Sequence, residues 1–162
     1  IIPNPEANGP AWFVKEVRAV NDPTEELKVV EEIDTKVTAV IDQSKFAVKT
    51  PVAYDSSATV KLVDHKPNVM KYEVNSSTGG LIVFSEIYYP KGWHAFIDGQ
   101  EVQMLRANYV LRALEVPPGT KTIEMRFEPK PYIVGNKITM ASSWVLLIIV
   151  LGGMVVAVRR PA

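Results

Sequence analysis

The residues best suited to chemistry in this sequence gather in one stretch that is rich in aromatic side chains. Tyr88 to His94 contains two tyrosines, a tryptophan and a histidine, and Arg106 to Tyr109 follows after a predicted hairpin turn at Asp98-Gly99. Aromatic faces stack on the C–H faces of sugar rings, while carboxylate, amide and guanidinium groups form two-point hydrogen bonds with hydroxyls. The stretch is therefore a candidate sugar or phosphosugar site. Its candidate substrate-binding residues are Tyr88, Tyr89, Trp93, Arg106 and Asn108.

The same stretch has a purely structural interpretation, which is the commoner arrangement for such a pattern. Trp93 and one tyrosine would then belong to the core, and Asp98 would only form its turn, because Asp-Gly supplies the positive φ angles that a tight hairpin needs. The sequence leaves both interpretations open.

Catalysis by this chain alone is not expected. His65 and His94 lack the spacing of a metal-binding pair, and the nucleophile-elbow, phosphate-loop and dinucleotide-binding motifs do not occur. The chain has no cysteine, which excludes disulfides, thiolate ligands and cysteine nucleophiles. The sequence therefore predicts no catalytic residue, no metal ligand and no cofactor.

Charge and length narrow the class of protein further. The 162 residues include eighteen basic and eighteen acidic side chains, so no general electrostatic attraction to nucleic acid is expected. The length suffices for one domain with a substantial core and an appendage. The first residue is Ile1 rather than Met, which predicts that the chain is a piece of a longer protein.

The candidate residues would be positioned by a run of predicted strands between Gly80 and Pro129. Runs rich in β-branched and aromatic residues alternate there with Pro- and Gly-containing turns, which predicts four or five consecutive antiparallel strands in a meander. The predicted strands are Leu81 to Tyr89, Trp93 to Ile97, Glu101 to Leu105, Tyr109 to Val116 and Thr122 to Phe127.

The first half of the chain predicts further strands and one short helix. The strands are expected at Trp12 to Val20, Val37 to Ile41, Thr59 to Val63 and Lys71 to Val74. Asp22 is the predicted N-cap of the helix, with Pro23 at its first position and Glu25 completing a capping box. The helix is expected to bury Leu27, Val30 and Ile33 and to expose Glu25, Glu26, Glu31 and Glu32.

The last segment differs in character from the rest. Ile138 to Val158 is 21 residues without a charge and would span roughly 30 Å as a helix, the thickness of a bilayer core. It predicts a transmembrane helix, near one end of which the hydroxyls of Thr139, Ser142 and Ser143 can bond back to helix carbonyls. Arg159 and Arg160 argue for a cytoplasmic C-terminus, but Lys130 and Lys137 on the other side balance them.

These motifs together resemble the C-terminal part of the YfhO family of bacterial polytopic membrane proteins. The resemblance covers nearly the whole chain, and its sequence character is nearest to the Bacteroidetes members. It rests on Asn4-Pro5, Gly9-x-Ala11-Trp12-Phe13-Val14, Tyr88-Tyr89-Pro90-x-Gly92-Trp93-x-Ala95-x-Ile97-Asp98-Gly99, Arg106-Ala107-Asn108-Tyr109-x-Leu111-Arg112-Ala113, Val116-Pro117-x-Gly119-x-Lys121, Phe127-x-Pro129 and Gly135.

The resemblance implies a function that composition does not. Members of the family look like C-type glycosyltransferases, with a multi-helix membrane portion that uses a lipid-phosphate-linked sugar and an outward-facing domain before the last membrane helix. That arrangement places Arg159 and Arg160 on the cytoplasmic side of the membrane. The multi-helix portion and its acidic loop residues are absent from this sequence, so no catalytic residue is carried over.

The sequence thus predicts an all-β, jelly-roll-like antiparallel sandwich with one short helix and a C-terminal transmembrane helix. Its segments are an opening linker (1–11), the extracytoplasmic domain (12–132), a juxtamembrane linker (133–137), the membrane span (138–158) and a cytoplasmic tail (159–162). The expected setting is the bacterial inner membrane, with the domain on the periplasmic side. The expected partners are the bilayer, a lipid-linked sugar or glycan, and the multi-helix portion or another envelope protein. The alternative is a non-enzymatic scaffold that docks an envelope protein through strand edges and the Gly152-Gly153 helix face.

Overall fold

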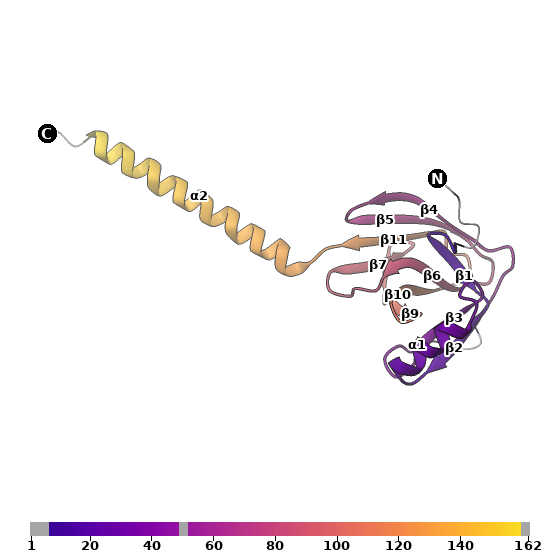
Figure 1. Ribbon diagram of the computed structural model, residues 1–162. Coiled ribbons are helices and arrows are strands. Elements are labelled where there is room, and N and C mark those ends of the chain that lie inside the picture. Colours follow the sequence, from indigo (N-terminus) through magenta and orange to yellow (C-terminus); the bar gives the residue numbers. More distant parts are fainter. Residues whose placement is uncertain (1–6, 49–51, 160–162) are drawn as a thin grey trace, which may run out of the picture. The chain divides into compact units, whose positions relative to one another are not determined.

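The computed structural model describes residues 7–48 and 52–159 and divides the chain into two compact units. Ile1–Phe127 contains a β-sandwich, and Glu128–Ala162 contains a long helix, α2 (Lys130–Arg159) (Figure 1). The predicted opening linker and cytoplasmic tail lie mostly outside the described residues.

Two antiparallel sheets form the sandwich, which confirms the predicted fold class. The first sheet has the order β1-β6-β10-β9, with β1 (Ala11–Val14), β6 (Gly80–Ile87), β10 (Leu111–Val116) and β9 (Leu105–Ala107). The second sheet has the order β4-β5-β11-β7-β8, with β4 (Thr59–Lys66), β5 (Val69–Asn75), β11 (Thr122–Phe127), β7 (Trp93–Ile97) and β8 (Gln100–Val102).

The strands after Gly80 do not form the predicted meander. The chain passes from β6 in the first sheet to β7 and β8 in the second, returns for β9 and β10, and crosses again for β11. The predicted strand Glu101 to Leu105 is broken for the same reason, since β8 pairs with β7 whereas β9 pairs with β10. The alternation of apolar and polar side chains predicts which face of a strand is buried, but it does not predict which of the two sheets the strand joins.

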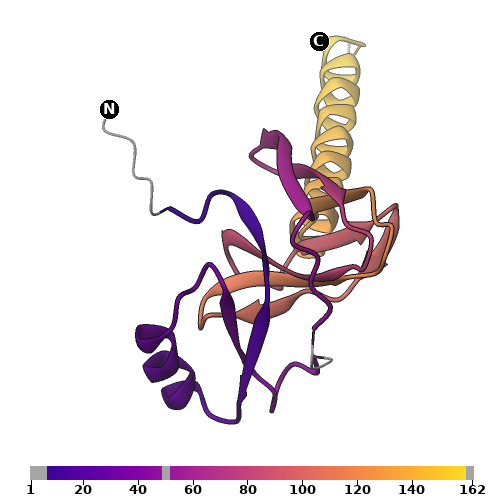
Figure 2. The same ribbon diagram turned by 90° about the vertical axis from the view of Figure 1, so that its right-hand side faces the viewer.

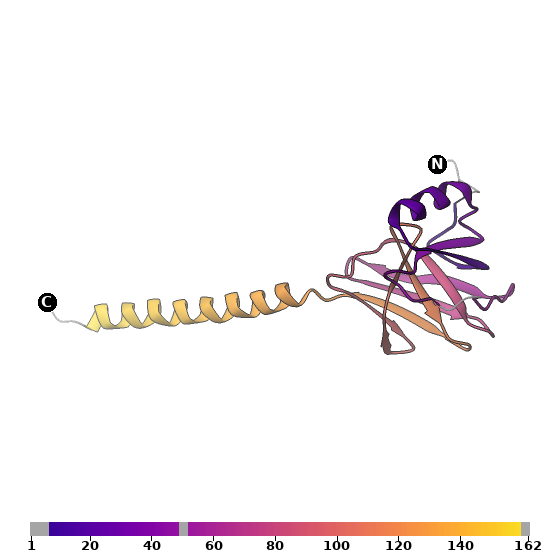
Figure 3. The ribbon, with the colours of Figure 1, turned by 90° about the horizontal axis from the view of Figure 1, so that it is seen from below.

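A third layer covers the outer face of the first sheet. It consists of β2 (Glu16–Val20), α1 (Pro23–Glu32) and β3 (Thr38–Asp42), with β2 and β3 pairing in parallel. Figures 1, 2 and 3 all place α1 at the periphery of the domain. The predicted single strand Trp12 to Val20 is interrupted at Lys15, because β1 pairs with β6 and β2 pairs with β3.

The first sheet is consequently buried on both faces. Ile82 and Phe84 point into the core between the two sheets, and Leu81 and Val83 point into a second core against β3. This burial explains the unbroken apolar run of β6, since a strand with one solvated face would alternate apolar and polar residues. Each such side chain contributes about 1.5–3 kcal/mol when fully buried.

Helix α1 begins as predicted but faces the core differently. The side chain of Asp22 accepts hydrogen bonds from the backbone N–H groups of Thr24 and Glu25, at 3.0 and 3.1 Å. Leu27, predicted to be buried, is 45 % exposed, and the predicted solvent exposure of Glu26 is wrong because its side chain is fully buried. The inward stripe is Glu26, Val29, Val30 and Ile33, which follows the i, i+3, i+4, i+7 spacing of one helix face.

Helix α2 is long and apolar enough to cross a membrane, and none of its apolar window is buried among the described residues. It begins at Lys130 rather than Ile138, so the predicted juxtamembrane linker is helical. Pro131 is compatible with this start, because the first-turn N–H groups have no helical partner. The hydroxyls of Thr139, Ser142 and Ser143 donate to carbonyls four residues earlier, at 2.9–3.0 Å, as predicted.

Two glycines with similar backbone angles provide a test of the packing where β6 begins. A Cβ at Gly79 (φ +74°) would lie 2.3 Å from the Val116 carbonyl oxygen, whereas a Cβ at Gly119 (φ +80°) meets no atom within 4 Å. Gly119→Ala should therefore cost only about 1–2 kcal/mol for the left-handed conformation. Gly79→Ala should cost about 1–3 kcal/mol more from overpacking, measured by urea unfolding of the full chain in detergent micelles. Equal losses would contradict the close approach at Gly79.

Candidate functional site

The five candidate residues lie at one end of the sandwich, where β6 ends and β10 begins. Tyr88 and Tyr89, on the connection from β6 to β7, and Trp93, the first residue of β7, form what we call the aromatic corner. Arg106 and Asn108 lie on β9 and the turn after it. The two groups are joined through a residue that the sequence did not single out, Phe46. Its ring packs edge-on against Tyr88 at 5.4 Å, and the Arg106 guanidinium lies 6.0 Å from its centroid.

Trp93 is held by stacking on both aromatic and cationic neighbours. The Arg112 guanidinium lies 4.2 Å from the Trp93 ring centroid, and the Phe127 ring lies at 5.3 Å. The Nε of Arg112 also donates to the Ile87 carbonyl at 2.9 Å. Arg112 is only 3 % exposed, and this burial lowers its pKa, although Glu86 opposes the shift. Trp93 is therefore a packed part of the corner.

Arg112 was not a predicted site residue, yet strand periodicity could have identified it. It alternates with Leu114 and Val116 along β10, and these two side chains belong to the core between the sheets. A charged residue that alternates with buried apolar residues along a strand is predicted to be buried as well. It is then a candidate site residue, because a buried guanidinium needs specific partners.

The two tyrosines of the corner differ in exposure. The Tyr88 N–H donates to the Val110 carbonyl at 2.7 Å, and partial burial raises the pKa of its phenol. Tyr89 is 49 % exposed. The corner therefore presents the ring of Tyr89 beside a fixed backbone and two half-buried aromatic rings.

Arg106 belongs to a cluster of buried charges. Its Nη2 atom lies 2.6 Å from Glu26 Oε2 and 3.9 Å from Asp42 Oδ2, and both carboxylates are fully buried. The other Glu26 oxygen accepts the Tyr109 N–H at 2.8 Å. We call Glu26, Asp42, Arg106 and Asn108 the buried ion cluster.

Asp42 has its own set of stabilising partners at the end of β3. It accepts hydrogen bonds from the Ser44 hydroxyl at 2.5 Å and the Ser44 N–H at 3.1 Å, and the Lys45 ammonium lies at 3.4 Å. The hydroxyl bond is the largest of the effects that lower the pKa of Asp42, and burial opposes them. Asp42 is therefore held as an anion inside the domain.

Asn108 pairs with β3 as a strand residue would. Its Oδ1 atom accepts the Val40 N–H at 2.8 Å, and its own N–H donates to the Val40 carbonyl at 2.9 Å. Asn108 and Tyr109 have φ angles of +49° and +70°. Asparagine tolerates this conformation, whereas for a residue such as tyrosine it costs about 1–2 kcal/mol. The bond from Tyr109 to Glu26 helps to hold it.

The buried ion cluster keeps unused hydrogen-bonding capacity. Among the described residues, three buried side-chain atoms lack a hydrogen-bond partner, and all three belong to the cluster: Asp42 Oδ2, Arg106 Nε and Asn108 Nδ2. Buried polar atoms of this kind are the usual partners of internal water. The contacts of Arg106 and Asn108 within the domain are thus chiefly structural ones.

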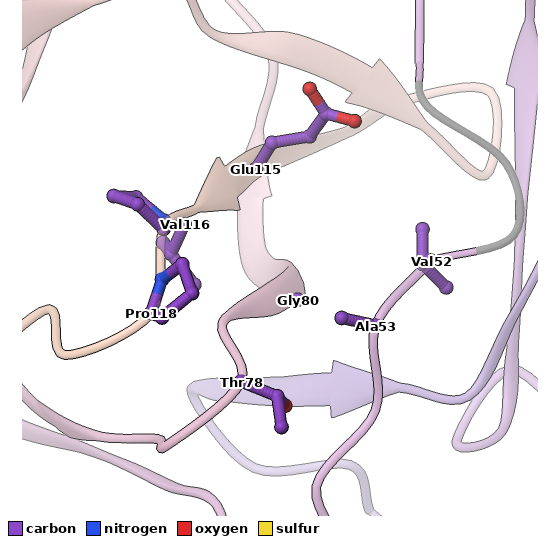
Figure 4. Close-up of a pocket in the computed structure, with 8 residues that line it drawn as sticks. Val52, Ala53, Thr78, Gly80, Glu115, Val116 and Pro118 are labelled. Carbon is purple, nitrogen blue, oxygen red and sulfur yellow. The ribbon is translucent and has the colours of Figure 1, made fainter.

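A pocket lies at the opposite end of the first sheet. It has a volume of about 430 Å³, and Gly80 at the start of β6 faces Val116 at the end of β10 there (Figure 4). Thr78 and Glu115 contribute its polar side chains, while Val52, Ala53, Pro117 and Pro118 complete the wall. This lining includes none of the predicted site residues.

The histidines are engaged in pairwise contacts. His94 Nδ1 lies 2.6 Å from Glu101 Oε1, and His65 Nε2 lies 4.0 Å from Glu86 Oε1. Within residues 7–48 and 52–159, no three His, Asp or Glu side chains are grouped as a metal site requires.

Comparison with known proteins gives one match. The family model described as "Bacterial membrane protein YfhO" matches residues 34–139, which is more than half of the 162-residue chain. The matched part runs from before β3 into α2 and includes all five candidate residues. No curated protein and no solved structure matches the chain.

The Glu26 carboxylate offers a direct test of the buried ion cluster. Glu26→Ala should lower the free energy of unfolding by about 3–5 kcal/mol, because it removes the nearest carboxylate partner of the largely buried Arg106 guanidinium and the acceptor of the Tyr109 N–H. Of its carboxylate contacts, Arg106 would keep the more distant one, with Asp42 at 3.9 Å. Glu26→Gln should cost less, since its amide oxygen can still accept the Tyr109 N–H. Glu25→Ala, an exposed neighbour, is the matched control and should change stability little. Urea unfolding followed by tryptophan fluorescence measures all three, and equal effects at positions 25 and 26 would refute the buried pairing.

Proposed function

Because this chain belongs to the YfhO family of bacterial membrane proteins, we propose that its β-sandwich is the extracytoplasmic accessory domain of a C-type glycosyltransferase-like protein. The parent protein would transfer sugars from a lipid-phosphate carrier to cell-envelope glycans in the inner membrane. The sandwich would shape the acceptor side of the reaction or brace the membrane portion. The resemblance of the family to such transferases supports the proposal.

The half-exposed ring of Tyr89 is the observation that carries the sugar-facing role. Its backbone neighbour Tyr88 is fixed to Val110, and the stacked pair of Arg112 and Trp93 supports the next strand. A partly exposed aromatic ring beside a fixed backbone suits sugar binding, because stacking then needs less ordering of the protein. The Arg106 and Asn108 side chains would act by placing the corner, since their contacts lie inside the domain.

The bond-breaking step is assigned to the membrane portion of the parent protein and not to this chain. A transferase of this kind needs a base or metal ligand beside the lipid-linked sugar. In the proposal, this chain supplies acceptor binding and structural support, and its partners are the bilayer, the glycan and that membrane portion.

A scaffold function is the second candidate, and one observation favours it. Arg106 and Asn108, the two most polar candidate residues, have partners within the domain. A domain with this core could dock another envelope protein through its strand edges, with the Gly152-Gly153 pair of α2 allowing close helix packing. Glycan binding distinguishes the two functions.

Tyr89→Ala tests the sugar-facing role. The full chain in nanodiscs would be titrated calorimetrically with an envelope oligosaccharide and with a polyprenyl-phosphate-linked hexose, using the sugar-free lipid as reference. Tyr89→Ala should weaken saturable binding about tenfold, equivalent to about 1.4 kcal/mol of lost stacking. Tyr54→Ala removes a similarly exposed tyrosine near the opposite end and should have no effect. No glycan binding by the unaltered chain, with transfer by the parent protein unchanged on Tyr89→Ala, would leave the scaffold function.

The orientation of the domain can be tested cleanly because the chain has no cysteine. Ser56→Cys, at an exposed position of the sandwich, should react with a membrane-impermeant maleimide in intact spheroplasts. Ala162→Cys should react only after permeabilisation, since the arrangement implied by the family resemblance puts the end of the chain that carries Arg159 and Arg160 on the cytoplasmic side. The opposite labelling pattern would overturn the extracytoplasmic placement.

A further inference from the structure

Four large apolar side chains are exposed together at the aromatic end of the sandwich. Ile87, the last residue of β6, is 69 % exposed, and Tyr89, which follows the strand, is 49 % exposed. Tyr109 and Val110 precede β10 and are 38 % and 46 % exposed. The two loops meet through the Tyr88 N–H bond to the Val110 carbonyl and the pairing of Ile87 with Leu111. We call these four residues the apolar rim. An exposed apolar cluster of this kind marks an interaction surface.

The rim is built on a fixed backbone. Tyr109 keeps its φ of +70° while its N–H bonds to the buried Glu26 carboxylate. The Ile87 carbonyl accepts the Arg112 Nε–H at 2.9 Å. Tyrosine in the left-handed region is a genuine outlier, and such strain persists only where surrounding contacts hold it. The fold thus maintains the exposed Tyr109 in this conformation at a cost in stability.

The chain leaves the sandwich for its apolar helix from this same end. Arg112 bridges the Ile87 carbonyl and the Trp93 ring, and Trp93 pairs in register with Phe127, the last residue of β11. Only Glu128 and Pro129 separate β11 from α2. Even fully extended, the link from Phe127 to Lys130 spans at most about 10 Å. The end of the sandwich that carries the rim is therefore the end tethered to the helix.

We propose that the apolar rim inserts into the headgroup boundary of the bilayer that α2 is long and apolar enough to cross. Tyrosine is suited to that boundary because its ring is apolar and its hydroxyl remains hydrated. Ile87 and Val110 would add apolar area in the outer part of the acyl region. The exposed Lys91, in the same loop as Tyr89, would lie at the level of the lipid phosphates.

The bilayer is favoured over a protein partner by this short tether. Two residues link this surface to α2, and ten (128–137) separate it from the charge-free segment of that helix. The rim is therefore held within reach of the lipid headgroups at high effective concentration, without any recognition step. The proposal does not depend on glycan binding and applies equally to a transferase accessory domain and to a scaffold.

Depth-dependent fluorescence quenching tests the proposal in the full 162-residue chain. Single cysteines at Ile87→Cys and Val110→Cys would carry an environment-sensitive fluorophore, with Tyr54→Cys as the matched control. Ala53 lies against Gly80, so Tyr54 is near the far end of β6, about 23 Å along that strand from Ile87. The chains would be reconstituted in nanodiscs of phosphatidylcholine and phosphatidylglycerol, with and without a lipid spin-labelled near its headgroup.

Quenching at positions 87 and 110 should exceed that at position 54 by about twofold or more, because a rim residue would lie within the boundary layer. Equal quenching at all three positions, or no quenching at 87 and 110, would overturn the proposal. A fluorescence change at positions 87 and 110 that depends on protein concentration and not on spin-label content would also overturn the proposal, because it would show that a second copy of the chain covers the rim. Unchanged thermal unfolding of the labelled variants confirms that their fold is intact. A chain that shows the expected quenching but binds no glycan would refute only the sugar-facing function.

Discussion

The position of α1 against β9 and the turn after it depends on one buried carboxylate, whereas β3 is held to the first sheet by an apolar core. Within α1 only Glu26 is fully buried, while the apolar residues beside it on the inward face, Val29 and Val30, are partly buried. The two oxygens of Glu26 accept hydrogen bonds from the Arg106 guanidinium, on β9, and from the Tyr109 N–H, on the turn after β9. A buried ion pair contributes little net stability compared with an apolar pair of the same size. The ion pair instead determines geometry, because the Glu26 carboxylate reaches both of its partners in only one position of α1. The same turn is joined to β3 by the hydrogen bond from the Val40 N–H to Asn108 Oδ1.

The surface at the end of the sandwich follows from that buried contact. Arg106, once paired with Glu26, lies against Phe46, and Phe46 packs on Tyr88. On the other side of the corner, Arg112 stacks on Trp93 and holds the Ile87 carbonyl. Two arginines thus brace the connections that present Tyr89 and Val110 to solvent. Substitutions that disturb either arginine should be understood first as changes in the position of these loops.

Local chemistry made some elements predictable and left others open. Short-range patterns predict three features correctly: the N-cap at Asp22, the bounds of β7 and β11, and the hairpin at Asp98-Gly99. The φ angles of that hairpin are +47° and +84°. The assignment of strands to sheets does not, because inward and outward faces look alike in either sheet. The break at Lys15 and the division of β8 from β9 follow from that assignment. The burial of Glu26 was not predicted because the buried face of the helix was assigned from Leu27. The burial of Arg112 was not predicted because its alternation with Leu114 along the strand was not considered.

The motif from Arg106 to Tyr109 changes meaning once its contacts are known. As a sequence it offers a guanidinium and an amide for sugar hydroxyls, but in the fold both groups face inward to Glu26 and Val40. On the outer surface, the motif and the residue after it place Tyr109 and Val110 beside Ile87 and Tyr89. Tyrosine rings can serve a sugar and a lipid headgroup alike, since both present apolar C–H surface beside hydroxyl or phosphate oxygens. A lipid-linked sugar carries both chemistries in one molecule, so a single end of the sandwich could meet the carrier at the membrane surface and the sugar just above it.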